Sequence, residues 1–200
     1  MDRRTLAAVA VATLIAVAGC SGSVTFGEET TAAQNRTATV VDVVDGDTVD
    51  VRFEDGTEER VRLLGVDTPE TYEDVSPDEF EGVPDTDAGR SCLRTWGEQA
   101  SEYADQRLAG ETVTVELDPV SDRRGGYDRL LAYVVVDSET SETPRTTEGD
   151  GAVNGDSFNR ALLEEGYARL YDSEFTKRDD YASVERQARE NGTGLWACAS

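Results

Sequence analysis

Three valine-rich runs follow one another between residues 38 and 66, and an Asp-Gly pair separates each run from the next. The first two form ATVVDVVDGDTVDVRF (38–53) and break at Asp45-Gly46-Asp47, and the third is EERVRLLGV (58–66). Valine-rich runs favour strands and Asp-Gly pairs favour tight hairpin turns, so this stretch predicts a meander of three strands. The fold is therefore expected to be built around a β-sheet.

Later segments extend the sheet and add helices. Alternating or apolar runs predict two more strands, and helical spacing with an Asp156 cap and glycine stops predicts three helices. The strands are expected at 111–120 and 127–137, the helices at 92–108, 156–166 and 179–194, a short extended piece at 167–171, and polar loops at 71–90 and 138–153. This pattern predicts an α+β protein: a five-stranded OB-fold β-barrel with three covering α-helices, an architecture that often binds nucleic acids.

The first twenty residues have the organisation of an export signal. Arg3 and Arg4 precede an apolar run that ends in VAGC at Cys20 and is too short for an ordinary transmembrane helix. VAGC resembles a lipobox with Cys20 as the lipidated residue, and the arginine pair resembles a twin-arginine signal. We expect an exported protein at the cell surface, held to the membrane only by this lipid anchor; simple secretion is the alternative. Residues 21–37 are expected to be a flexible tether and 38–198 the folded domain.

The charge balance is strongly acidic. The net charge is −23, with one lysine and no histidine among 200 residues. Such a surface is typical of proteins that work in molar salt, where repulsion is screened within about 3 Å at 1 M; the periodic apolar segments argue against a disordered acidic chain. The absence of histidine excludes Ser-His-Asp and Cys-His catalysis and histidine-bound zinc. Catalysis would have to use carboxylates, arginines, tyrosines or a metal.

Three cysteines allow a simple pairing. If Cys20 carries lipid, Cys92 and Cys198 remain, and a pair in an exported chain is expected to form a disulfide. Such a bridge would tie the C-terminus to the start of a helix. Two separate buried thiols are the alternative.

Acidic side chains gather at the ends of the first strands. Asp45 and Asp47 flank a glycine at the first turn and Asp67 ends the third strand, so the three carboxylates are expected to converge at one rim of the barrel. Converging carboxylates repel one another unless a hard cation such as Ca²⁺ joins them. An EF-hand loop beginning at Asp45 is excluded, because its twelfth position is Gly56 instead of glutamate.

Two arginines and one glutamate complete the set. Arg62 lies in the apolar third strand and Arg129 near the start of another, and two guanidiniums at one rim can clamp a phosphodiester. Phosphoryl transfer depends mainly on positioning and charge neutralisation, which a metal and two arginines provide. Glu70, just beyond Asp67, is placed to hold or deprotonate an attacking water. Each residue taken alone is more simply explained as a surface charge.

The motifs VVDVVDGDTVDV, RVRLLGVDTPE, WGEQASEYADQRL, YDRLLAYV and NRALLEEGYARL, in this order, resemble the thermonuclease family of staphylococcal-nuclease-like domains. The resemblance covers about residues 38–196 and, with the leader, is to an exported lipoprotein form of haloarchaeal type. It implies Ca²⁺-dependent hydrolysis of DNA and RNA. It implies Asp47 and Asp67 as calcium ligands, with Asp45 close by and the Thr68 carbonyl as a further oxygen.

The resemblance also implies catalytic and binding roles. Glu70 would act as general base or orient the water, and Arg62 and Arg129 would stabilise the transition state on the scissile phosphate. Tyr127 matches a tyrosine that contacts the nucleotide, and Tyr171 is the nearest candidate for a second such tyrosine.

Two departures from the family pattern concern nucleic-acid affinity. Asp128 stands where the family usually has glycine, and the 71–90 loop is acidic where the family has lysine-rich loops. With a net charge of −23 we expect a monomer with weak binding, a preference for single-stranded DNA or RNA, and activity in high salt. The competing hypotheses are a non-catalytic OB-fold module that binds nucleic acid or a partner, and a calcium-stabilised envelope protein.

Overall fold

The computed structural model describes residues 35–72, 75–136 and 157–199. These residues belong to the second of two units of the chain, Thr31–Ser200, and the first unit, Met1–Thr30, lies outside them. The expected leader, Cys20, most of the 21–37 tether and the 138–153 loop therefore lie outside the described residues. Within the described part, no helix has the length and apolar character needed to cross a membrane.

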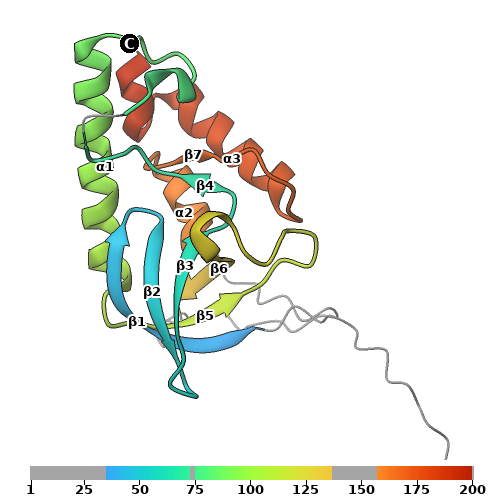
Figure 1. Ribbon diagram of the computed structural model, residues 1–200. Coiled ribbons are helices and arrows are strands. Elements are labelled where there is room, and N and C mark those ends of the chain that lie inside the picture. The colour runs from blue at the N-terminus through green and yellow to red at the C-terminus, as the bar shows by residue number, and fades with distance from the viewer. Residues whose placement is uncertain (1–34, 73–74, 137–156, 200) are drawn as a thin grey trace, which may run out of the picture. The chain divides into compact units, whose positions relative to one another are not determined.

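Five strands close into a barrel in the order β1-β2-β3-β6-β5 (Figure 1). All neighbouring strands are antiparallel except β3 and β6, which run parallel with Val61 opposite Leu130. The strands are β1 Arg36–Asp45, β2 Thr48–Phe53, β3 Glu58–Leu63, β5 Thr112–Glu116 and β6 Leu130–Val136. The predicted α+β class and five-stranded barrel are confirmed.

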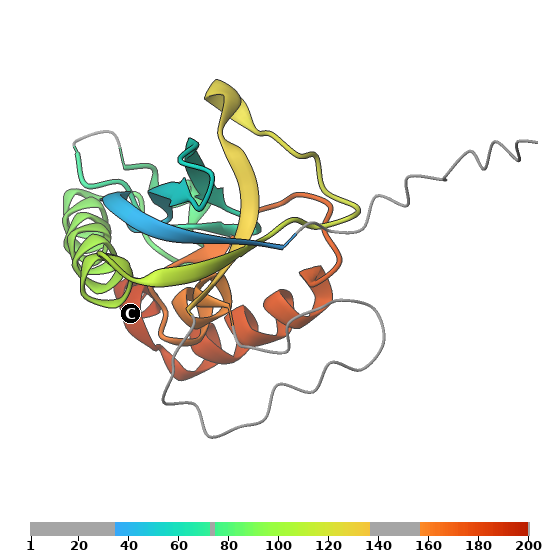
Figure 2. The same cartoon turned by 90° about the horizontal axis from the view of Figure 1, so that it is seen from below.

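Three α-helices accompany the barrel, as predicted. They are α1 Asp87–Leu108, α2 Phe158–Glu164 and α3 Arg178–Asn191. In Figure 1, α1 runs alongside β1, and Figure 2 shows α2 and α3 side by side on one side of the barrel. Inward-facing strand side chains such as Val49, Val51 and Val61 are fully buried and pack with helix residues in one core.

All three helices start at residues other than those predicted, although α3 begins only one residue early, at Arg178. α1 begins five residues before Cys92, because the Thr86 side chain accepts a hydrogen bond from the Gly89 N–H and caps the helix. Its first turn has no apolar periodicity, which is why the pattern missed it. The predicted Asp156 cap of α2 is replaced by Ser157, which accepts a hydrogen bond from the Arg160 N–H.

The predicted third strand, 58–66, is interrupted. β3 ends at Leu63, and Gly65 has a left-handed φ of +78° where any side chain would meet the Phe175 ring. The chain then forms β4 (Val66–Asp67), which pairs with β7 (Arg169–Leu170) in a separate two-stranded sheet. This turn takes Asp67 out of the barrel wall.

The other predicted strands are shorter in the structure. β5 ends at Glu116, and β6 starts only at Leu130, because Tyr127 and Asp128 adopt left-handed backbone angles in a 3₁₀ turn. The extended piece predicted at 167–171 is present as β7. Two short 3₁₀ helices, Pro77–Glu79 and Gly194–Ala199, were not predicted.

A buried asparagine, Asn159, ties α2 to the barrel. The Asn159 amide donates to the carbonyls of Leu64 and Ala132, and its oxygen accepts from the Val134 N–H. All of its contacts are 3.0–3.1 Å long, and the residue is fully buried. Since unsatisfied buried polar groups are costly, these bonds hold the end of β3 firmly against β6.

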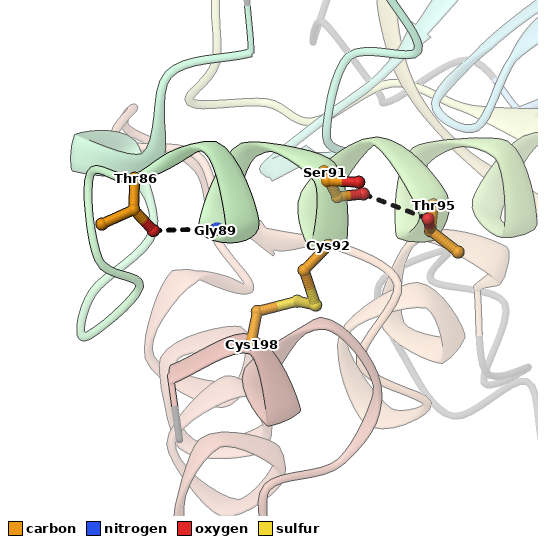
Figure 3. Close-up of a disulfide and its surroundings, with 6 residues drawn as sticks. All are labelled: Thr86, Gly89, Ser91, Cys92, Thr95 and Cys198. Carbon is orange, nitrogen blue, oxygen red and sulfur yellow. Dashed lines mark hydrogen bonds between the residues drawn. A yellow bond between two sulfur atoms is a disulfide. The ribbon is translucent and has the colours of Figure 1, made fainter.

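A disulfide joins Cys92 on α1 to Cys198, with Cα atoms 5.9 Å apart (Figure 3). The bridge lies in a second apolar cluster formed by α1, α3, the C-terminal 3₁₀ helix and the 75–83 segment. Glu79 of that segment pairs with Arg169, which also pairs with Asp67, so the cluster connects the C-terminus with the surroundings of Asp67.

Removal of this bridge is expected to lower the free energy of unfolding by about 2–5 kcal/mol, because it closes a loop of 106 residues. Denaturant unfolding of the full chain should show the same loss in the Cys92→Ala/Cys198→Ala variant and in reduced wild type. A wild-type protein whose unfolding midpoint is insensitive to reductant would contradict the prediction.

Asp118 joins two loops at the end of the barrel. Its carboxylate accepts hydrogen bonds from the backbone N–H groups of Val120, Ser121 and Thr176, and from the hydroxyls of Thr176 and Tyr133. Burial acts to raise the pKa of Asp118, but the bonds from Thr176 and Tyr133 outweigh it and hold the pKa below the usual value.

Because the pKa of Asp118 is depressed in the folded state, its stabilisation is present above the ordinary value of 3.8 and is lost as the pH falls through the folded-state pKa. Asp118→Asn is therefore expected to destabilise the fold by about 2–3 kcal/mol at pH 7, and by less as the solution becomes acidic. Unfolding measured against pH in molar salt tests this. Asp122→Asn, an exposed change in the same loop, is the control.

Candidate active site

One cavity of about 660 Å³ collects all the predicted catalytic, substrate-binding and metal-binding residues. It opens at the rim of the barrel where β1, β3 and β4 end and where the turn before β6 begins. The predicted residues that line it are Asp45, Asp47, Arg62, Asp67, Thr68, Glu70, Tyr127, Arg129 and Tyr171.

Arg62 lies between two of the predicted metal ligands. Its Nη2 donates a hydrogen bond to Asp67 Oδ1, and its Nη1 lies beside Asp47 Oδ1, each at 2.5 Å. Burial disfavours the charge on Arg62, but the carboxylates of Asp47 and Asp67 outweigh this and raise its pKa. Nη1 is buried and makes no hydrogen bond of normal geometry within the described residues, although it forms the close ion pair with Asp47.

Asp47 is held rigidly by the strand end across from it. Its Oδ2 accepts hydrogen bonds from the backbone N–H of Thr68 at 2.8 Å and from the Thr68 hydroxyl at 3.1 Å. Asp47 and Thr68 are both buried. The first turn and the end of β4 are thereby locked together, which fixes where both carboxylate-bearing segments meet.

The two other acidic residues have raised pKa values. Burial and then the neighbouring charge of Asp47 raise the pKa of Asp45, whose Oδ1 accepts from the Asp47 N–H at 3.1 Å. Burial also raises the pKa of Asp67, although Arg62 and Arg169 oppose this shift. Burial thus disfavours negative charge on both carboxylates, and at Asp67 it does so despite the two arginines beside it.

Glu70 lies on an exposed turn that α1 supports from behind. Gly97 on α1 contacts the backbone there so closely that a Cβ at Gly97 would lie 2.3 Å from the Pro69 carbonyl oxygen. The Glu70 side chain is exposed and makes no hydrogen bond or ion pair with any other described residue. Its backbone is therefore fixed while its carboxylate remains free to contact a water or substrate.

Arg129 follows a strained turn at the other wall of the cavity. Tyr127 and Asp128 have φ values of 58° and 60°, a conformation that is uncommon for residues other than glycine and that often marks functional sites. The Arg129 Nε donates to the Gly126 carbonyl at 3.1 Å, and no carboxylate among the described residues pairs with its guanidinium. Tyr127 is 97% exposed, with the Arg129 guanidinium 5.7 Å from the centre of its ring.

The carboxylate of Asp128 does not face Arg129. It is strongly exposed and lies 3.5 Å from Nε of Arg124, which also pairs with Glu59 at 2.8 Å. Although Asp128 replaces the family's glycine next to Arg129, its carboxylate therefore does not pair with the Arg129 guanidinium.

Sequence reasoning missed Arg169. Its Nη2 lies 2.7 Å from Asp67 Oδ2 and 3.0 Å from Glu79 Oε2, so it links β7, β4 and the 3₁₀ helix Pro77–Glu79. Its guanidinium also lies 6.0 Å from the ring of Tyr171, which is half-exposed in the cavity. The sequence signal that could have identified Arg169 was its position two residues before Tyr171, in the short extended piece predicted at 167–171.

The acidic residues fit calcium by their chemistry. Ca²⁺ takes carboxylate and carbonyl oxygens, and the rim offers both in Asp45, Asp47, Asp67 and the Thr68 carbonyl. The described residues contain no ready-made cage of three acidic or sulfur ligands. Arg62 lies between Asp47 and Asp67 and separates their carboxylates.

A closed five-stranded barrel whose rim holds acidic residues next to two arginines defines an OB-fold protein of the α+β class with a polar, anion-compatible site. The chain belongs to the family described as staphylococcal nuclease homologue, whose model matches residues 60–198.

Curated relatives are similar over most of the domain. An uncharacterized protein of Methanocaldococcus jannaschii is 39% identical over 160 residues, which cover 78% of this chain and 70% of that protein. The thermonuclease of Staphylococcus hyicus is 28% identical, with 82% of this chain and 78% of that protein covered. Endonuclease YncB of Bacillus subtilis is 31% identical, with 77% of this chain and 58% of that protein covered.

Proposed function

We propose that this chain is a calcium-dependent nuclease that hydrolyses phosphodiester bonds of DNA and RNA. The observation that carries the proposal is the single cavity in which carboxylates, two arginines, Glu70 and exposed tyrosines meet. Membership of the staphylococcal nuclease family, and relatives named thermonuclease and endonuclease, support it.

The side chains divide the work of hydrolysis among them. Glu70 would hold the attacking water and either take its proton or orient it, because its carboxylate is exposed beside the cavity. Arg129 would donate to the phosphate oxygens, since no described carboxylate competes for its guanidinium. Arg62, which lines the same cavity and pairs with Asp47 and Asp67, would add its positive charge next to the phosphate. As the water oxygen bonds to phosphorus, the ester oxygen leaves, and both arginines would stabilise the extra negative charge.

The metal would be held by the acidic strand ends. Asp47 and Asp67 would be its ligands, with Asp45 nearby and the Thr68 carbonyl as a further oxygen. Bound Ca²⁺ supplies Lewis-acid polarisation of a phosphate oxygen. Thr68 would keep the Asp47 carboxylate in place through the two hydrogen bonds it already donates.

The surface charge favours particular substrates and solution conditions. Many arginines outside the cavity are paired with acids, as in Arg60–Asp50, Arg52–Glu58 and Arg124–Glu59, so few cations remain for phosphate contacts. We therefore propose a preference for single strands, held by tyrosine stacking and the site arginines, and activity in high salt. The proposed setting is the outer face of the membrane, with a monomer anchored by lipid on Cys20 or secreted.

The full chain, folded in molar salt and mixed with denatured DNA, provides the test. Cleavage is expected with Ca²⁺, none with a chelator, and full recovery when Ca²⁺ is returned in excess. Circular dichroism on the same samples establishes that the protein is folded. Folded protein that leaves DNA intact at every Ca²⁺ concentration would favour a non-catalytic OB-fold binding module.

A further inference from the structure

A second cavity of about 380 Å³ adjoins the candidate active site. Its volume lies within the range of roughly 300–1,000 Å³ that is usual for small-molecule sites. It shares with the active site Asp67, Thr68, Glu70, Tyr72 and Tyr171, and its other walls are Val75, Ser76, Glu79, Phe80 and Arg169. A strand bound at the active site would therefore reach this cavity without a break.

The charges of the second cavity disfavour a phosphate group. Arg169 is the only basic side chain among the described residues that line it, and it already pairs with Asp67 at 2.7 Å and with Glu79 at 3.0 Å. Glu70 adds a further negative charge with no partner among the described residues. A phosphate placed there would meet carboxylates without a free cation, so the cavity suits the uncharged part of a nucleotide better than its phosphate.

The aromatic side chains suit a base. Tyr72 is 59% exposed and Tyr171 49% exposed, so both present ring surface to a ligand. Val75 and Phe80 are buried and form an apolar wall, and the Arg169 guanidinium lies 5.5 Å from the centre of the Phe80 ring. Every base has a π-face, so stacking on a tyrosine holds an unpaired base without regard to sequence.

We propose that this cavity is a subsite for the base of the second of the two nucleotides that flank the scissile phosphate, the one that a mononucleotide lacks, with Tyr72 as its stacking platform. The inference rests on the proposed nuclease function and extends it to the substrate on either side of the cleaved bond. A base enters the subsite only when it is unstacked and unpaired, which a single strand allows and a duplex resists. Tyr72, outside the family-matched catalytic residues, thus becomes a determinant of strand and length preference.

The test compares ligands of different length on the full chain. Wild type, Tyr72→Ala and Tyr72→Phe are titrated with thymidine 5′-phosphate and with a phosphorothioate octathymidylate, which resists cleavage. Val120→Ala is the matched control, because Val120 is also 59% exposed but lines neither cavity. Cleavage of an ordinary octathymidylate with Ca²⁺ is measured on the same preparations.

Tyr72→Ala is expected to weaken octanucleotide binding about tenfold, within the range for loss of one stacked base, and to leave mononucleotide binding within twofold. Tyr72→Phe and Val120→Ala should bind both ligands as wild type does. Unchanged octanucleotide binding, or equal weakening for both ligands, overturns the subsite. Absence of cleavage by wild type would instead overturn the nuclease function, and the length-dependent loss would still establish the subsite.

Discussion

Replacement of Arg129 by glutamine is expected to lower kcat for DNA hydrolysis by about three to five orders of magnitude, the range measured when an arginine that stabilises a phosphoryl transition state is lost. The structure gives the physical reason. Apart from its Nε bond to the Gly126 carbonyl, the Arg129 guanidinium has no hydrogen bond or ion pair with another described residue. It can therefore turn its full charge toward phosphate oxygens.

The kinetic signature separates this role from general attraction of DNA. An interaction made only in the transition state lowers kcat and kcat/KM together and leaves KM nearly unchanged. Arg129→Lys should retain part of the activity, because it keeps the charge and loses the planar fork of donors. Arg123→Gln removes an equal charge from the same loop at an exposed position and should leave kcat within a few-fold of wild type. Equal losses in Arg123→Gln and Arg129→Gln would contradict the assigned role.

Arg62 is a poorer choice for the same experiment, although it occupies the same cavity. It is tied to Asp47 and Asp67, and its removal leaves the buried Asp47 carboxylate without its ion-pair partner, whereas Asp67 still pairs with Arg169. Loss of a buried partner of this kind costs about 3–5 kcal/mol of stability. A loss of activity in an Arg62 variant would thus combine folding with catalysis, whereas Arg129 has no such structural bond to a carboxylate.

The barrel could be predicted from local signals, and the missed details have identifiable physical causes. Asp-Gly turns and alternating apolar residues define the strands, so the meander and the later strands were found. The break at Gly65 was missed because the ring that leaves no room for a side chain there belongs to a residue distant in sequence, Phe175. The early start of α1 was missed because Thr86 capping acts through one hydrogen bond and leaves no apolar pattern.

The site was predictable where neighbours in sequence are also neighbours in space. Asp67, Thr68 and Glu70 follow one strand end, so their convergence can be read along the chain. Arg169 lies 90 residues beyond Glu79 in the sequence, yet it pairs with both Glu79 and Asp67. The pairing of β4 with β7 brings Arg169 next to Asp67. Similarly, the direction of the Asp128 side chain depends on the left-handed turn and on Arg124, neither of which a motif reveals.

Glu70→Gln is expected to lower kcat by about 10²–10⁴-fold, the usual range for loss of a positioned general base. The fold should be unaffected, because the Glu70 side chain is exposed and bonded to no other described residue, while its backbone is held by contact with Gly97. Hydrolysis of single-stranded DNA under Ca²⁺ saturation, with thermal unfolding of each variant, measures both effects. Glu98→Gln, an exposed change on the adjacent turn of α1, is the matched control.

The comparison of Glu70→Gln with Glu70→Ala then separates the two roles open to this carboxylate. Glutamine can still accept a hydrogen bond from the attacking water, but it cannot take up the proton. If Glu70 is the proton acceptor, both variants should lose activity to the same degree; if it only orients the water, glutamine should retain clearly more than alanine. A Glu70→Gln protein that cleaves as fast as wild type would remove Glu70 from the mechanism and leave catalysis to the metal and the arginines.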